Sequence, residues 1–347
     1  MDFTFTEDQL LFQQSVKDFL VNEVTPERIR NTWETENGRD EALWGQLAEL
    51  GLTGITVPEA HGGLGMNEVD FVLLAQECGY VALPEPLVHC ALVAVPTLCN
   101  LGGDLAAEWL PRIAAGEAKV VVGVAQNPMV EDAHVADLLL LQKGDAVYAA
   151  SPDQIELRHN ESVDPSRRLF AVEIGDQCTA VASGQEAASL MTGALNRGAL
   201  GAAAQALGLA QRMVDMSVQY TSERTQFGKP IGSFQAVKHH MADVAVRLEY
   251  AKAPVHRAAY AVADQQVLQD QAVSQAKLLA CEAANLAAKH CIQVHGAMGY
   301  TWEVDLHIFM KKAWALANTW GDAGFHKQRV AEHIFRPGAA LGAGATF

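Results

Sequence analysis

The chain has 347 residues and a formal net charge of −16 at pH 7; half of its residues are hydrophobic and 19% are charged. This composition is typical of a globular protein and not of a disordered one, and the negative charge argues against a nucleic-acid partner, which needs a basic surface. No stretch of about 20 apolar residues is present to span a bilayer, and residues 1–20 lack the basic start and apolar run of a signal peptide. The six cysteines have no metal-site or redox spacing, so we expect a cytoplasmic protein.

The first third of the chain carries helix signals. Thr6 followed by Gln9 forms the capping-box pattern of a helix start, and apolar residues recur behind it at helical spacing. Three more helical segments are expected over residues 40–50, 67–81 and 86–116. We therefore predict an N-terminal helical domain over residues 1–117.

The pattern changes after Gly116, where short β-rich runs alternate with polar turns. These runs cover residues 119–124, 137–141, 146–149 and 168–174. They predict a small middle β domain over residues 118–185. Long alanine-rich helices return over residues 186–347. The sequence thus predicts a mainly α fold with a small β domain between two helical parts.

One motif runs from Tyr220 to Asp243 and combines an arginine, a turn and a glutamine. Arg224 can bind a pyrophosphate through its planar guanidinium fork. Phe227 offers an apolar wall beside the turn, and Gln235 can both donate and accept hydrogen bonds. Arg224 taken alone also fits a surface arginine in a loop between helices, but the whole motif favours a ligand.

A second motif follows at residues 293–303. It begins at Gln293 and contains Gly296, and glycine lets the backbone approach a ligand closely. His295 lies between them, and the sequence leaves open whether it contacts a ligand or is structural. A third, glycine-rich motif at residues 47–65 is no dinucleotide-binding fingerprint, because no strand and helix frame it in the required order; we interpret it as architecture.

Together these three motifs resemble the acyl-CoA dehydrogenase family over nearly the whole chain. The resemblance implies N-terminal helices, a middle β domain and a C-terminal four-helix bundle, with FAD as cofactor and α,β-dehydrogenation of an acyl-CoA thioester as the reaction. It also implies that Arg224, Phe227 and Gln235 reach across a dimer interface to the neighbour's FAD. Gln293 and Gly296 are then expected to pack against the adenosine part of that FAD.

The chain departs from the family at its catalytic base. Family members place a glutamate either 27 residues after the loop glutamine or 26 residues before the pyrophosphate arginine. Counting from Gln293 reaches Trp320, and counting back from Arg224 reaches Gly198. A tryptophan cannot accept a proton and glycine has no side chain, so no catalytic residue is expected. The family's threonine–glutamate–proline turn, which contacts the flavin, is replaced by the stretch 124–128.

These departures make the chain similar to the short, non-catalytic subunits of heterotetrameric bacterial steroid side-chain acyl-CoA dehydrogenases. That resemblance implies a catalytic partner subunit, one FAD per heterodimer, a bulky steroid side-chain CoA as substrate and an electron-transferring flavoprotein as acceptor. Two alternatives stay open: a self-sufficient homotetramer with Asp322 or Glu303 as an unusual base, and a scaffold protein that binds no flavin. The histidine pairs 239–240 and 290–295 lack metal-ligand spacing, so we expect no metal site.

Overall fold

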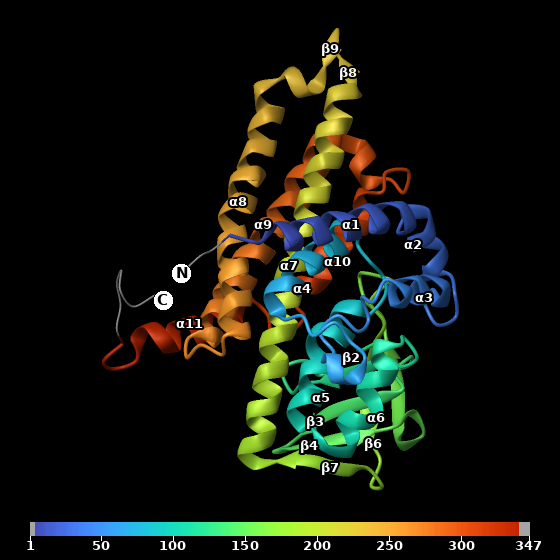
Figure 1. Cartoon of the computed structure of the whole chain (residues 1–347). Coiled ribbons are helices and arrows are strands. Elements are labelled where there is room, and N and C mark those ends of the chain that lie inside the picture. Colours follow the sequence, from blue (N-terminus) through green and yellow to red (C-terminus); the bar gives the residue numbers. More distant parts are fainter. Residues whose placement is uncertain (1–3, 340–347) are drawn as a thin grey trace.

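Helices come first, strands second and helices again in the computed structural model, which describes residues 4–339 (Figure 1). The mainly helical fold with a small β part agrees with the prediction. The helices of the first part are α1 (Glu7–Glu23), α2 (Pro26–Trp33), α3 (Glu41–Glu49), η1 (Glu59–His61), α4 (Glu68–Tyr80), η2 (His89–Ala94), α5 (Val95–Leu101) and α6 (Gly103–Ala114).

Polar N-cap residues precede several of these helices. Thr6 accepts a hydrogen bond from the backbone of Gln9, whose side chain accepts from Thr6 in return, so the predicted capping box is present. Asp40 caps α3 by accepting the N–H of Leu43, and Asn67 forms a capping box with Asp70 at the start of α4. The helices expected over 40–50 and 67–81 are therefore confirmed within a residue at each end.

Strands β1 to β7 form two sheets in the lower part of Figure 1, beside α5, α6 and the lower end of α7. One sheet has the order β1-β3-β4-β7, with β1 and β3 parallel and the other pairs antiparallel. The other has the order β2-β6-β5 and is antiparallel. The strands are β1 (Val120–Gly123), β2 (Val130–Glu131), β3 (Leu138–Lys143), β4 (Ala146–Ala150), β5 (Ile155–Asn160), β6 (Leu169–Ile174) and β7 (Thr179–Ser183), with the short helix η3 (Pro152–Gln154) before β5.

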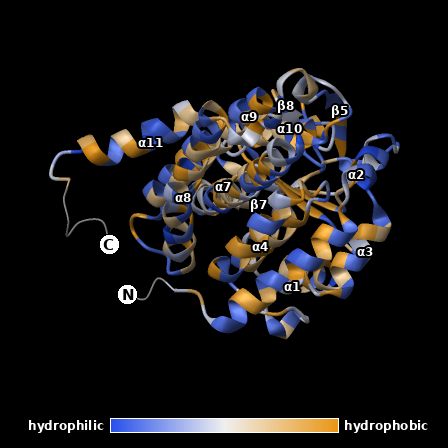
Figure 2. Cartoon of the chain, turned by 90° about the horizontal axis from the view of Figure 1, so that it is seen from above, coloured by the Kyte–Doolittle hydropathy of each residue, from blue (hydrophilic) through white to orange (hydrophobic). Residues whose placement is uncertain are grey.

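The third part is a bundle built on α7, a helix of 40 residues that rises from the sheets to the far end of the molecule (Figure 1). A two-stranded hairpin joins α7 to α8, and α9 and α10 complete the packing. Seen from above, α11 extends away from the other helices (Figure 2). The elements are α7 (Gly184–Glu223), β8 (Thr225–Gln226), β9 (Lys229–Pro230), η4 (Ile231–Ser233), α8 (Gln235–Ala263), α9 (Gln269–His295), η5 (Gly296–Tyr300), α10 (Leu306–Ala317) and α11 (Ala323–Phe335).

Two glycines let α7 lie directly against α4. A Cβ atom on Gly208 of α7 would lie 1.9 Å from the backbone oxygen of Gln76, and one on Gly79 of α4 would lie 2.1 Å from the backbone oxygen of Gln205. The two backbones are therefore in contact, and the first helical part is anchored to the bundle. Within residues 4–339, no helix is both long enough and apolar enough to cross a bilayer.

Candidate functional site

Arg224 lies at the top of α7, where the helix ends and the hairpin begins (Figure 1). Its N–H donates to the oxygen of Tyr220, and its own oxygen accepts from Ile231, both at 2.8 Å. These backbone bonds hold the residue in place while its side chain is exposed. The guanidinium is thus presented to the outside of the chain.

Phe227 stands at the tip of the β8–β9 hairpin. It and Gly228 both have positive φ angles, of 53° and 78°, which is the signature of a two-residue type I′ turn. The ring is 91% exposed and meets Phe234 edge-on at 6.1 Å between centroids. A non-glycine residue at positive φ is strained, so the hairpin holds an aromatic ring in solvent at a cost.

Gln235 is the first residue of α8 and is exposed. The residue before it, Phe234, supplies no side-chain acceptor to this helix end. A helix N-terminus carries partial positive charge. Gln235 therefore lies on an electropositive helix end, close in sequence to the hairpin.

Gln293 and Gly296 lie where α9 ends. The N–H of Gly296 donates to the oxygen of Gln293, and Gly296 has a φ of 61°. Both residues are exposed, and a Cβ on Gly296 would meet nothing within 4 Å. The chain at Gly296 is thus open to close approach from outside.

His295 packs the end of α9 against the end of α7. Its ring stacks on Tyr220 of α7, with centroids 4.3 Å apart and an interplanar angle of 19°, and its Nδ1 lies 2.8 Å from the oxygen of Cys291. The side chain is buried, and burial lowers its pKa. His295 is therefore a packing residue between α7 and α9. The structure brings all five predicted FAD-contact residues to the same end of the bundle, and we call them the upper group: Arg224, Phe227, Gln235, Gln293 and Gly296.

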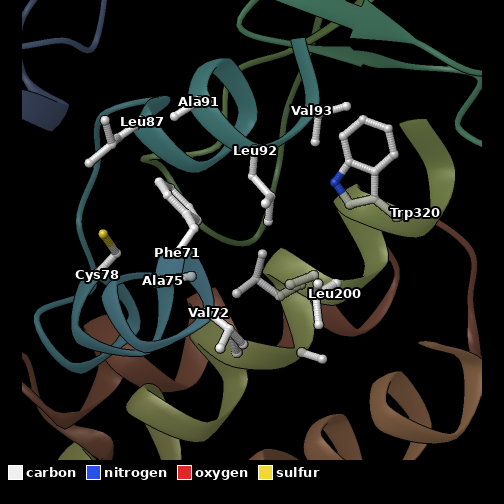
Figure 3. Close-up of a cluster of buried hydrophobic side chains, with 14 of the residues drawn as sticks. Phe71, Val72, Ala75, Cys78, Leu87, Ala91, Leu92, Val93, Leu200 and Trp320 are labelled. Carbon is white, nitrogen blue, oxygen red and sulfur yellow. The ribbon is translucent and has the colours of Figure 1, made fainter. Parts of the chain in front are cut away.

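The two positions where the family has its glutamate lie elsewhere, and they touch each other. Trp320 is in the turn between α10 and α11, and a Cβ on Gly198 of α7 would lie 2.1 Å from the Trp320 ring. The indole is 8% exposed and meets His89 edge-on at 5.2 Å. Figure 3 shows it beside Val93, at the edge of the buried cluster.

Hydrogen bonds hold the backbone of Trp320 on both sides. Its N–H donates to Oδ1 of Asn127 at 3.0 Å, and its oxygen lies 3.0 Å from Nε2 of His326. His326 is fully buried, and desolvation lowers its pKa to about 4. It is therefore neutral at pH 7, and because a carbonyl only accepts, Nε2 carries the proton and Nδ1 accepts from the Ser274 hydroxyl, 3.0 Å away.

The space left beside Trp320 is small and polar. A cavity of about 50 Å³ lies between the indole, Glu85, Glu131 and Lys312. This volume suits one or two water molecules and not a ring. Oε2 of Glu85 is buried there without a hydrogen-bond partner, and burial raises its pKa to about 6.

The two alternative bases stand apart from this cavity. Asp322 is exposed, and its side chain accepts the N–H of Phe325 at 2.8 Å as the N-cap of α11. Glu303 is exposed in the loop after η5, on the side of the upper group. No group of three or more metal-ligating side chains occurs in the part of the chain from residue 4 to residue 339.

The upper group and the Trp320 turn are far apart. Gly198, which touches Trp320, precedes Arg224 by 26 residues of the same helix. At a rise of about 1.5 Å per residue this is roughly 39 Å. Sequence reasoning identified both regions but not Asn127 and His326, which hold the Trp320 turn. Only the replaced flavin-contact stretch at 124–128 pointed toward Asn127.

Comparison with known proteins gives a consistent result. The sequence profile described as "Acyl-CoA dehydrogenase, N-terminal domain" matches residues 6–117, and that described as "Acyl-CoA dehydrogenase, C-terminal domain" matches residues 188–335. The chain is 30% identical to acyl-CoA dehydrogenase IpdE2 of Mycolicibacterium smegmatis, over 95% of this chain and all of that protein. It is also 30% identical to IpdE2 of Mycobacterium tuberculosis, over 88% of this chain and 91% of the relative.

Solved structures share the fold at lower identity. A chain of the ChsE4-ChsE5 complex from Mycobacterium tuberculosis superposes with a TM-score of 0.88 at 23% identity, covering 98% of this chain and 100% of the other. A chain of the Tcur3481-Tcur3483 steroid ACAD G363A variant gives 0.87 at 23% identity, covering 96% and 99%. From the matched domains and the full-length relatives, the chain belongs to the acyl-CoA dehydrogenase family.

Proposed function

We propose that this chain is the subunit of an FAD-dependent acyl-CoA dehydrogenase that completes the FAD site of a catalytic partner and supplies no catalytic base. The separation of the two regions carries this proposal. Arg224 and the rest of the upper group face outward, about 39 Å along α7 from the filled position at Gly198 and Trp320. The upper group therefore serves a cofactor whose reacting part is held by another chain.

The chemistry of the upper group fits the pyrophosphate and adenosine parts of FAD. The Arg224 guanidinium offers a planar fork for phosphate oxygens. Gly296, with open space around its Cα, lets the backbone lie against a sugar or base. Gln235 and Gln293 are exposed amides that donate and accept hydrogen bonds. When bound, FAD supplies the acceptor for the hydride that leaves the acyl group.

No side chain at the filled position is suited to remove the α-proton. The indole N–H of Trp320 only donates, and Gly198 has no side chain. Asp322 is engaged as the cap of α11, where its carboxylate stabilises the helix N-terminus. No feature of the turn favours the homotetramer with Asp322 as base.

We further propose that the assembly holds two copies of this chain and two of a catalytic subunit. The ChsE4-ChsE5 and Tcur3481-Tcur3483 structures each name two chains, and the second is described as a steroid ACAD. A bulky steroid side-chain CoA is the substrate that we propose, because one acyl site per pair leaves room for a ring system. An electron-transferring flavoprotein is the proposed acceptor, and the cytoplasm the proposed location.

Co-production tests this assignment. The chain is produced alone and together with a candidate catalytic acyl-CoA dehydrogenase subunit, and FAD content and subunit ratio are measured. We expect little FAD in the single chain and one FAD per pair in the complex. A yellow, active homotetramer from the single chain overturns the proposal.

The substitution Arg224→Ala tests the part played by the upper group. Charge-assisted hydrogen bonds contribute about 1.5–3 kcal/mol, so we expect FAD affinity of the complex to fall roughly 10- to 100-fold at about 1.4 kcal/mol per tenfold. Arg247 is an exposed arginine in the middle of α8, and Arg247→Ala is the matched control. We expect this variant to leave the FAD affinity of the complex unchanged. Equal FAD affinity in the Arg224 variant and the control contradicts a contact across the interface.

A further inference from the structure

Strand β5 forms one edge of the sheet β2-β6-β5. It pairs with β6 on one side along its whole length, from Ile155 to Asn160. Its other side is open: within residues 4–339, no backbone–backbone hydrogen bond outside this ladder reaches the strand, and the Arg158 oxygen accepts only from the side chain of Asn160. Figure 2 shows β5 near the rim of the molecule. The strand therefore presents free backbone donors and acceptors, to which another strand can be added.

The side chains of β5 leave this edge accessible on both faces. Residues 156–159 are all exposed, and Leu157 among them is an exposed apolar residue. Leu157 lies on the same face as Ile155, because side chains alternate along a strand. Ile155 packs against the smaller of the two core clusters, which lies between the sheets. The apolar face of this sheet thus continues to its open edge.

The charges on β5 have no partners of opposite sign. Glu156 lies directly opposite Glu173 of β6, and like charges in this position are destabilising. In the part of the chain that the structure describes, residues 4–339, neither carboxylate forms an ion pair, and nor does Arg158. An arginine placed on the open side of Glu156 would offset the repulsion.

A second copy of β5 supplies that arginine in one antiparallel register. The backbone groups of alternate residues point to the open side, so the registers allowed to two identical strands differ by steps of two residues. One of them places Glu156 opposite Arg158 of the second copy, twice by symmetry, with Leu157 opposite Leu157. The neighbouring registers place Glu156 opposite Glu156 or Arg158 opposite Arg158. Charges on an edge strand commonly oppose pairing, and here they oppose the neighbouring registers and favour this one.

We propose that β5 is a self-association edge, through which two copies of this chain join their sheets into one sheet across a two-fold axis. Backbone hydrogen bonds hold the strands together, the two Glu156–Arg158 pairs fix the register, and the Leu157 side chains meet on the apolar face. The sheets lie at the opposite end of α7 from the hairpin (Figure 1), so the upper group stays free for a catalytic subunit. One pair of edge strands is a small interface, so we expect a dissociation constant on the order of 100 μM.

Charge exchange tests the register. Glu156→Arg and Arg158→Glu each place like charges opposite each other twice, so each purified chain should associate about tenfold more weakly than the wild type. An equimolar mixture of the two variants sets arginines of one copy against glutamates of the other and should recover the association of the wild type. Sedimentation velocity over a concentration series measures all of these proteins.

The control for net charge is Glu117→Arg, at an exposed loop residue after α6, which should associate as the wild type does. A wild-type chain without measurable association overturns the proposal. Equal association of the wild type and both single variants also overturns it, as does a mixture that associates no better than either variant alone.

A cross-link tests the position of the two-fold axis. In the proposed register Leu157 meets Leu157 of the second copy, and Cβ atoms of opposite residues lie about 4.5–5.5 Å apart, within a small movement of the separation in a disulfide. With oxidised glutathione as the oxidant, Leu157→Cys should give a disulfide-linked dimer well above the wild-type background. Val163→Cys, at an exposed residue after β5, should not.

A Leu157→Cys chain that gives no more dimer than the Val163→Cys chain overturns the proposal. Neither the sedimentation nor the cross-linking experiment involves flavin or a second kind of subunit. Their failure is therefore distinct from a failure of the FAD measurements.

Discussion

At the scale of single residues, Gly198 and Trp320 depend on each other. In the wild type, a methyl group at Gly198 would overlap the indole, and overpacking of this kind costs about 1–3 kcal/mol. In a Trp320→Gly background the same Gly198→Ala change should stabilise the chain by about 0.5–1 kcal/mol, because alanine favours a helix interior. Urea unfolding of the four proteins measures this reversal. An effect of the same sign in both backgrounds contradicts the contact.

Because His326 binds the Trp320 oxygen, its protonation makes the stability of the chain depend on pH. Its folded pKa of about 4 lies below the ordinary 6.5, so its contribution to stability is present above pH 6.5 and is lost as pH falls toward 4. At about 1.36 kcal/mol per pKa unit, the loss is roughly 3 kcal/mol. His326→Gln keeps an N–H for the Trp320 oxygen and removes the titration, so the variant should lose less stability than the wild type between pH 7 and pH 5.

Glu85 titrates in the same range with the opposite sign. Its folded pKa, raised from 4.5 to about 6, gives stability below pH 4.5 that is lost as pH rises through 6. The pH dependence of the free energy of unfolding of the wild type therefore contains opposing contributions from Glu85 and His326. The difference between wild type and His326→Gln isolates the histidine, and parallel curves for the two proteins contradict its assignment.

At the scale of elements, the crossing of α4 and α7 depends on backbone contact. Gly208→Ala places a methyl group against the backbone oxygen of Gln76, which cannot move aside as a side chain can. We expect a loss of unfolding free energy of about 3 kcal/mol or slightly less. Gly45→Ala in α3 is the matched control: its Cβ meets nothing within 4 Å, and it should be neutral or stabilising. Similar losses in the two variants would show that the crossing is looser than described.

The sequence predicted the elements with strong local signals and failed where pairing decides the structure. Capping at Thr6 and the apolar run that became β3 were readable from neighbours along the chain. Strands β5 and β7 were not expected. Most side chains of β5 are exposed, and this strand is extended because it pairs with β6. The parallel pairing of β1 with β3 is likewise a property of the assembled sheet.

In the candidate site too, the sequence predicted individual residues but not the contacts between them. Motif spacing led to the residues of the upper group, and counting along the chain led to Trp320 and Gly198. Their mutual contact was not predictable, because it joins residues 122 positions apart through a turn with positive φ at a tryptophan. Asn127 and His326 carry no pattern of their own, and only the folded chain shows which backbone groups they bind.

At the scale of the whole molecule, the hairpin at the end of α7 projects away from the packed parts (Figure 1). Residues 222–230 are all exposed, so trypsin should cut the free chain after Arg224. In a complex in which this end contacts a partner and its FAD, the same bond should be protected. Mass spectrometry of timed digests measures both. Equal cleavage in the free chain and the complex contradicts the position of the interface.

The pairing of Gly198 with Trp320 also limits how this sequence can evolve. A carboxylate placed at Gly198 would collide with the indole, and one placed at Trp320 would leave the space beside Gly198 empty and put a charge in a buried turn. Each single substitution is therefore expected to lower the free energy of unfolding. The two positions are thus epistatic: a carboxylate can be introduced at either position without that loss only when both change together.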